Sequence, residues 1–190
     1  EALRDKQLDD FLKNKEKLLN VSKEKNDEII KDLSNQIINL GGKPTLDQSN
    51  QKILIKNLTK QVENLSIKSI INDDTKNIIC DDVIKGIKIR FQRIFDLPTK
   101  ELRQIVDNGK KDLVEGIVII FATIDDKVGL AVGVTDKLTK KYNAVDFVKI
   151  GSELVGGKGG GGRADFAQAG GIFESESKIN EAFARLKYLI

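Results

Sequence analysis

Residues 156–171 read GGKGGGGRADFAQAGG, and the interpretation of the whole chain starts from this run. Six of its first seven residues are glycine, which accepts positive φ and leaves no Cβ between the backbone and a ligand. Consecutive N–H groups can converge as an anion-binding nest, and Lys158 and Arg163 flank them with positive charge. Gln168 adds an amide that can contact a base edge or a ribose. The run predicts a binding loop whose contacts come from Gly156, Gly157, Lys158, Gly159, Gly160, Gly161, Gly162, Arg163 and Gln168.

A flexible linker is the alternative interpretation of a stretch so rich in glycine. The flanks disfavour it, because a helix is predicted before the run, and an ordered segment and a final helix are predicted after it. The run is not an NTPase phosphate loop, since no Gly-Lys-Ser or Gly-Lys-Thr ends it. It is not a dinucleotide fingerprint either, because it follows a predicted helix and not a strand.

The sequence around the run predicts a small α/β globular domain over residues 76–190, with a central sheet and flanking helices. Together with the helical arm that precedes it, this domain predicts a chain of the α+β class. Helices are expected over about 143–155, with Asn143 as N-cap, and from Ser175 or Ser177 onward. Another helix opens at 97–99. Alternation at Ile87, Ile89 and Phe91 indicates a strand. Residues 116–124 read as a buried strand, turning at 125–126 into a second strand with one covered and one open face.

Residues 1–75 predict a helical arm. Leucines at 12, 19, 33 and 40 share a heptad position over residues 1–40, and Leu8, Ile29 and Ile37 widen the stripe. Gly41 and Pro44 end this helix. A second amphipathic helix follows over about 48–72, and a short connection favours an antiparallel, coiled-coil-like hairpin. The arm is interpreted as a spacer, a dimerisation element or both; a compact bundle is the alternative.

Composition restricts the classes of function. The 190 residues carry a net charge of +3 and contain no histidine, which excludes His-based catalytic triads and most zinc sites. No apolar run is long enough to cross a bilayer, and no signal peptide is visible. A single cysteine, Cys80, suggests a reducing cytoplasm and is expected to be buried. Because the chain begins at Glu1 and not at Met, we expect a piece of a longer polypeptide.

Other charged residues near predicted element ends have ordinary explanations. The pairs Asp73-Asp74, Asp81-Asp82 and Asp125-Asp126 are interpreted as caps and turns, and no metal site is predicted. Four lysines precede the glycine run: Lys137, Lys140, Lys141 and Lys149. They form either a solvated face or an extension of the predicted phosphate contacts.

Residues 156–171 resemble the signature near the C-terminus of alanyl-tRNA synthetases, in which a glycine run leads into Gly-Arg-x-Asp-x-Ala-Gln-x-Gly-Gly. The resemblance implies the C-Ala region, with a helical arm and a DHH-associated globular fold. It further implies binding to the elbow of tRNA(Ala), dimerisation in many members, and support for the aminoacylation and editing domains of the same polypeptide. The parent enzyme would use ATP, magnesium and a zinc site outside this chain, and the fragment itself is expected to hold no catalytic residue and no cofactor.

Two alternatives remain. The chain could be a purely structural dimerisation module whose active part is the arm. The same globular fold also occurs in DHH-type phosphodiesterases, where the related glycine segment usually ends in histidine. Arg163 stands at that place, and the absence of histidine removes the Asp-His-His motif, so hydrolase activity is not expected.

Overall fold

The computed structural model describes residues 22–47 and 50–190. Contacts divide the chain after Ser69 into two compact units. In the described residues, no helix combines the length and the apolar character that a membrane span requires. The first part of the predicted heptad stripe, including Leu8, Leu12 and Leu19, lies outside the described residues.

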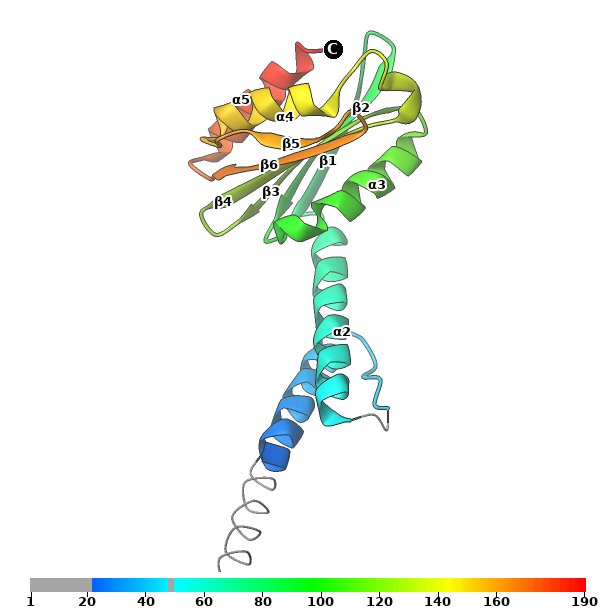
Figure 1. The fold of residues 1–190 in the computed structure, drawn as a ribbon, viewed down its shortest axis with the longest axis vertical. Coiled ribbons are helices and arrows are strands. Elements are labelled where there is room, and N and C mark those ends of the chain that lie inside the picture. Colours follow the sequence, from blue (N-terminus) through cyan, green and yellow to red (C-terminus); the bar gives the residue numbers. More distant parts are fainter. Residues whose placement is uncertain (1–21, 48–49) are drawn as a thin grey trace, which may run out of the picture. The chain divides into compact units, whose positions relative to one another are not determined.

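The arm contains two helices, over residues 22–39 and at α2 (Gln51–Ile71). They run in the same direction, so the predicted antiparallel orientation is wrong (Figure 1). Asn26 Nδ2 donates to Gln51 Oε1 at 3.2 Å, which places the two early ends side by side. Ile37, Leu54 and Leu58 form the buried centre.

The connection between the two helices explains their direction. Residues 42–47 and 50 adopt neither helix nor strand, and Gln61 of α2 holds this segment by donating from Nε2 to the Lys43 carbonyl at 2.6 Å. Ten extended residues reach roughly 33 Å, about the length of a 20-residue helix. The connection can therefore return to the start of the first helix, as a tight turn could not.

The globular unit is a six-stranded mixed sheet with helices on both faces, which confirms the predicted α+β class. Its elements are β1 (Asn77–Ile84), β2 (Ile87–Phe95), a 3₁₀ turn (Thr99–Glu101), α3 (Leu102–Leu113), β3 (Gly116–Ile124), β4 (Lys127–Val134), a 3₁₀ turn (Asp136–Leu138), α4 (Ala144–Leu154), β5 (Gly160–Arg163), β6 (Phe166–Ile172) and α5 (Glu176–Lys187).

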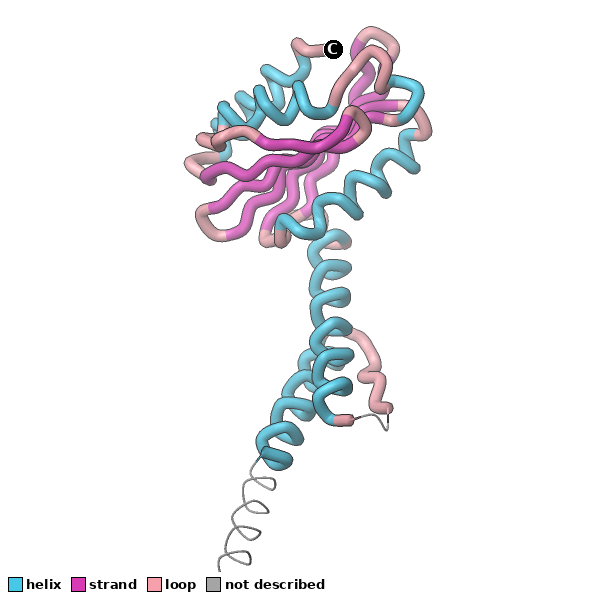
Figure 2. The backbone as a smooth tube through the Cα atoms, viewed as in Figure 1, coloured by secondary structure: helices cyan, strands magenta, loops and turns pink. Residues whose placement is uncertain are grey.

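The strand order is β1-β2-β3-β4-β6-β5. Only β2 and β3 are parallel, joined by the crossover helix α3, and every other neighbouring pair is antiparallel. Helix α3 covers one face of the sheet, and α4 and α5 cover the other (Figures 1 and 2). Strands β1 and β5 are therefore the two free edges.

Helix α3 buries the face of β4 that the sequence predicted to be open. The small residues Gly129 and Gly133 alternate with large apolar ones along this strand, which looks like an exposed face in the sequence. A Cβ at Gly129 would lie 2.8 Å from Leu102 Cδ1, and one at Gly133 would meet Val106. Glycine stands at both positions because a helix packs directly on the backbone there.

The opposite face holds the larger core. Phe121, Leu130 and Val132 of the central strands pack under α4 and α5. The Phe183 ring of α5 meets the edge of Phe121 at 4.9 Å between centroids, an arrangement that aromatic quadrupoles favour. The sheet and α4 thereby fix the position of the glycine-rich segment.

The predicted N-cap Asn143 is confirmed, and the last helix has Ser175, the first of its two predicted starts, as its N-cap. Asn143 accepts a hydrogen bond from the Val145 N–H, and Ser175 accepts one from the Lys178 N–H. The expected burial of Cys80 is wrong. Cys80 lies on β1, a strand that the sequence pattern does not reveal and that has a neighbour on one side only.

Candidate nucleic-acid interface

The glycine-rich run is not the loop that the sequence predicted. Its residues from Gly160 onward form the β5–β6 hairpin at the free edge of the sheet. In the strand pairing, Gly161 lies opposite Gln168 and Arg163 lies opposite Phe166. Because N–H groups alternate in direction along a strand, β5 presents a row of backbone donors and acceptors and not a convergent nest.

Several of the glycines are required by close packing. A Cβ at Gly160 would lie 2.5 Å from Ala169 Cβ and 2.7 Å from Val148 Cγ1 of α4. A Cβ at Gly157, Gly162 or Gly171 would collide with a neighbouring backbone carbonyl. These glycines let the hairpin lie against α4 and its own partner strand.

Gly159 and Gly161 have a different environment. A Cβ at either position would meet nothing within 4 Å. Gly159 also has a φ of 97°, a conformation that favours glycine. The backbone at these two positions is therefore open to an approaching molecule.

Arg163 lies at the tip of the hairpin, where it is 69% exposed. Its Nε donates to Asp165 Oδ1 at 3.1 Å and its Nη2 donates to Asp165 Oδ2 at 3.3 Å. The tip is anchored through the backbone as well, since the Val134 N–H donates to the Asp165 carbonyl. The guanidinium is thus oriented by its neighbour while its remaining donors face solvent.

Two cations from α3 join Arg163. The Arg103 guanidinium lies 5.1 Å above the Phe166 ring, and Lys110 Nζ lies 3.9 Å from Asp165 Oδ2. Arg103, Lys110 and Arg163, hereafter the hairpin cation cluster, surround the tip of the glycine-rich hairpin. Sequence reasoning missed Arg103 and Lys110, because nothing in the local sequence shows that α3 lies beside a hairpin more than fifty residues later.

A groove lies between the first turn of α3 and the β5–β6 hairpin. It has a volume of about 310 Å³ and is lined by Thr99, Leu102, Gly159, Gly160, Gln168, Ala169 and Gly170. Gln168 lies opposite Ala131 and so points to the α3 side of the sheet. The structure therefore brings Gln168, the open glycines and Arg163 together at one edge.

The predicted lysines do not gather at this groove. Lys158 is exposed on the connection between α4 and β5, next to the open glycines. Lys149 lies on α4, on the other side of the sheet from Gln168. Lys140 and Lys141 are exposed before α4, where Lys141 Nζ lies 5.1 Å from the Tyr142 ring centroid.

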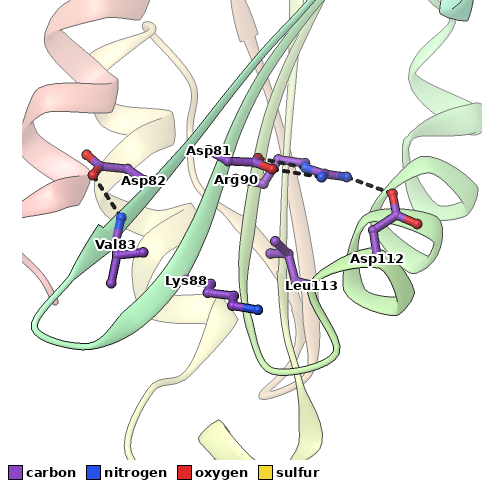
Figure 3. A pocket seen from close by; sticks show the side chains of 7 residues that line it. All are labelled: Asp81, Asp82, Val83, Lys88, Arg90, Asp112 and Leu113. Atoms are coloured by element: carbon purple, nitrogen blue, oxygen red, sulfur yellow. Dashed lines mark hydrogen bonds and ion pairs between the residues drawn. The ribbon is translucent and has the colours of Figure 1, made fainter.

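A second open pocket, of about 600 Å³, lies between β1, β2 and the end of α3 (Figure 3). Arg90 bridges two carboxylates there, donating to Asp81 at 2.8 and 2.9 Å and to Asp112 at 2.8 Å. These hydrogen bonds hold the pKa of Asp81 below its usual range and raise the pKa of Arg90. The carboxylates already neutralise a fixed cation, and among the described residues no group of three or more possible metal ligands occurs.

Comparison with known proteins identifies the family. The model of the DHHA1 domain matches residues 20–190. An alanine–tRNA ligase of Parvibaculum lavamentivorans is 49% identical over 87 residues, which cover 45% of this chain and 10% of that protein. The enzyme of Bradyrhizobium diazoefficiens is 43% identical over 105 residues, covering 55% and 12%. The chain therefore spans about a tenth of the length of these curated relatives.

A solved structure agrees with these matches. The crystal structure of the C-Ala domain from Aquifex aeolicus alanyl-tRNA synthetase superposes with a TM-score of 0.53 at 27% identity, covering 58% of this chain and 96% of that one. The family model covers most of the chain, including the glycine-rich hairpin. The chain therefore belongs to the DHHA1 domain family.

Proposed function

We propose that this chain is a tRNA-binding module of an alanine–tRNA ligase, and that it contacts tRNA through the β5–β6 edge. The observation that carries the proposal is the convergence, at this edge, of open glycine backbone with the hairpin cation cluster. The similarity to the C-Ala domain and to alanine–tRNA ligases supports the choice of RNA and of parent enzyme.

The edge suits a sugar–phosphate backbone. Arg163 can grip a phosphate with the donors that Asp165 leaves free, and Arg103, already stacked on Phe166, offers a second guanidinium. At Gly159 and Gly161 a ribose or phosphate can approach the main chain without meeting a side chain. Few groups here can read a base edge, with Gln168 the exception, so recognition follows tRNA shape more than sequence.

The parent protein, in this proposal, is an ATP-dependent ligase that attaches alanine to tRNA(Ala). The module would hold the elbow of the tRNA while catalytic and editing domains of the same polypeptide act on it. Self-association through the arm or the globular domain, and a cytoplasmic setting, belong to the same proposal. The lone, exposed thiol of Cys80 is compatible with a reducing compartment.

The test is a filter-binding titration of tRNA(Ala) against the chain and two variants, Arg163→Ala and Arg103→Ala. Each variant should weaken binding about tenfold, the value of one charge-assisted hydrogen bond. Each should also reduce the slope of log affinity against log salt by about one, because one phosphate contact disappears. Arg185→Ala is the matched control, since Arg185 is exposed on α5 at the opposite face of the sheet.

The outcomes separate clearly. Equal losses in all three variants would indicate non-specific attraction to positive charge. Undiminished binding by both hairpin variants would remove the β5–β6 edge from the site. If the unmodified chain does not bind tRNA at low salt, the proposal fails for this chain.

A further inference from the structure

The edge of the sheet opposite the glycine-rich hairpin is formed by β1, which has no neighbour on its outer side. It is eight residues long and pairs with β2 in an unbroken register without a bulge. It contains no proline, lysine or arginine. Natural edge strands usually carry such features because they prevent pairing with another chain.

The hairpin geometry shows which backbone groups face outward. Lys85 and Gly86 have φ values of 49° and 81°, as in the two-residue type I′ turn. The flanking residues Ile84 and Ile87 then form a hydrogen-bonded pair, and such pairs recur at every second residue. The odd-numbered residues of β1 therefore direct their N–H and C=O groups away from β2.

Two of these outward N–H groups are already used. The Asn77 N–H donates to the Asp73 carbonyl at 2.8 Å, and the Val83 N–H donates to Asp82 Oδ1 at 2.8 Å. The middle of the strand differs, because no hydrogen bond within the described residues uses the outward groups of Ile79 and Asp81. These two residues form a short open ladder.

The side chains of β1 favour contact and do not oppose it. Ile78 and Ile79 are 49% and 48% exposed and point to opposite faces of the sheet. The two acidic residues carry little free charge, since Asp81 pairs with Arg90 and Asp82 pairs with Lys187 at 3.1 Å. Each face of the strand thus carries one exposed isoleucine and one carboxylate that is paired with a cation.

We propose that β1 pairs antiparallel with β1 of a second copy of this chain, joining two six-stranded sheets across a two-fold axis at Ile79. The proposal rests on the self-association that the proposed function includes, and it names the surface. A symmetric pair needs one patch that complements itself. An eight-residue strand with an open ladder at its middle meets this requirement.

Side-chain pairing selects the register. With the axis at Ile79, that residue faces the partner's Ile79, Ile78 faces the partner's Cys80, and Asn77 faces the partner's Asp81. With the axis at Asp81, two carboxylates would face each other, which is destabilising. With the axis at Cys80, Ile78 and Ile79 would face the partner's carboxylates. Only the first register pairs both isoleucines with apolar side chains and also sets no carboxylate opposite another.

Single-cysteine cross-linking of the full chain tests this register. In a Cys80→Ser background, Ile79→Cys and Val83→Cys are oxidised separately in the absence of tRNA. The two Ile79→Cys residues would form a hydrogen-bonded pair with Cα atoms about 5.5 Å apart, within disulfide range. Val83 is the matched control because it is more exposed, at 63%, yet its two copies would lie roughly 26 Å apart.

The expected result is a covalent dimer for Ile79→Cys and none for Val83→Cys. Equal or stronger cross-linking through position 83 would indicate random collision and overturn the proposal. A chain that sediments as a dimer but yields no product at position 79 associates through another surface, which also overturns it. A chain that is monomeric and forms no cross-link also overturns the proposal. Because the cross-linking contains no RNA, this failure would not bear on the tRNA-binding proposal.

Discussion

The glycines of residues 156–171 are not equivalent, although the sequence makes them look alike. A methyl group added at Gly160 would have Ala169 and Val148 within contact distance, whereas one added at Gly161 would have no such neighbour. We expect Gly160→Ala to lower the free energy of unfolding by about 1–3 kcal/mol through overpacking. Gly161→Ala should leave it unchanged or raise it by up to about 1 kcal/mol. Urea denaturation measures both, and equal effects would contradict the assigned roles.

Arg93 is a buried cation with an imperfect partner. Its side chain is only 8% exposed, and Nη2 lies 3.3 Å from Glu176 Oε1 without a hydrogen bond. Burial lowers the pKa of Arg93, while Glu176 opposes that shift. The guanidinium also lies 4.5 Å above the Phe95 ring.

Removing only the carboxylate should therefore cost stability. Glu176→Gln leaves a buried charge without its counter-ion and should lower the free energy of unfolding by about 1 kcal/mol, a value kept small because Glu176 is 66% exposed. Arg93→Met removes the buried charge itself and should cost less than that. Thermal denaturation of both variants decides the order, and the reverse order would show that the ion pair is strongly stabilising.

Asp81 should give the fold a measurable dependence on pH. The hydrogen bond from Arg90 lowers the pKa of Asp81 in the folded state. The resulting stabilisation is present above the pKa of the unfolded chain and is lost as pH falls through the folded value. Asp81→Asn should therefore be less stable than the unmodified chain at pH 7, and the difference should vanish once the pH lies below the folded-state pKa of Asp81. A difference that persists in acid would assign the loss to packing.

For single residues, the sequence predicted local hydrogen bonds better than burial or contacts with distant residues. Asn143 was predicted as an N-cap because its short polar side chain acts locally, and the structure confirms it. Cys80 was misplaced because burial depends on which strand lies next to it. Arg103 was missed for the same reason, since its aromatic neighbour, Phe166, lies far along the chain.

Among the elements, α4 is the support of the glycine edge. Its N-terminus is capped by the Asn143 side chain, and Val148 on this helix is close to Gly160. Asn143→Ala should lower the free energy of unfolding by about 1 kcal/mol, because one N–H at the helix start loses its acceptor. Asn143→Asp retains an acceptor and should lose little. Urea denaturation measures both, and similar losses would argue against the cap.

Errors at the level of elements have a common cause. The sequence identified the strand over 128–134 but not the helix on its glycine face, since small residues suit either solvent or close packing. It identified two arm helices but not their direction, which depends on the long connection between them. It predicted a glycine loop because pairing with β6 is invisible in a run without side chains. Local patterns predict elements, whereas their partners are set by the fold.

For the molecule as a whole, the two compact units have separate cores. The arm is centred on Ile37 and Leu58, and the globular unit has a core of its own under α4 and α5. We therefore expect a fragment of residues 70–190 to unfold cooperatively, with a midpoint within a few degrees of that of the longer chain. Circular dichroism during heating measures this. Loss of cooperativity in the fragment would show that the arm is needed for folding.

The open edge of β5 has a consequence for genetics. Residues 160–162 have no side chain to delete, so alanine scanning there adds atoms where elsewhere it removes them. A phenotype at Gly161 would report an obstructed surface, and one at Gly160 would report a displaced strand. A mutational map of this region would therefore be interpreted differently from that of an ordinary segment. Elsewhere, a position that tolerates the loss of its side chain makes no important contact. Here, a position that tolerates an added methyl group would be one that nothing touches.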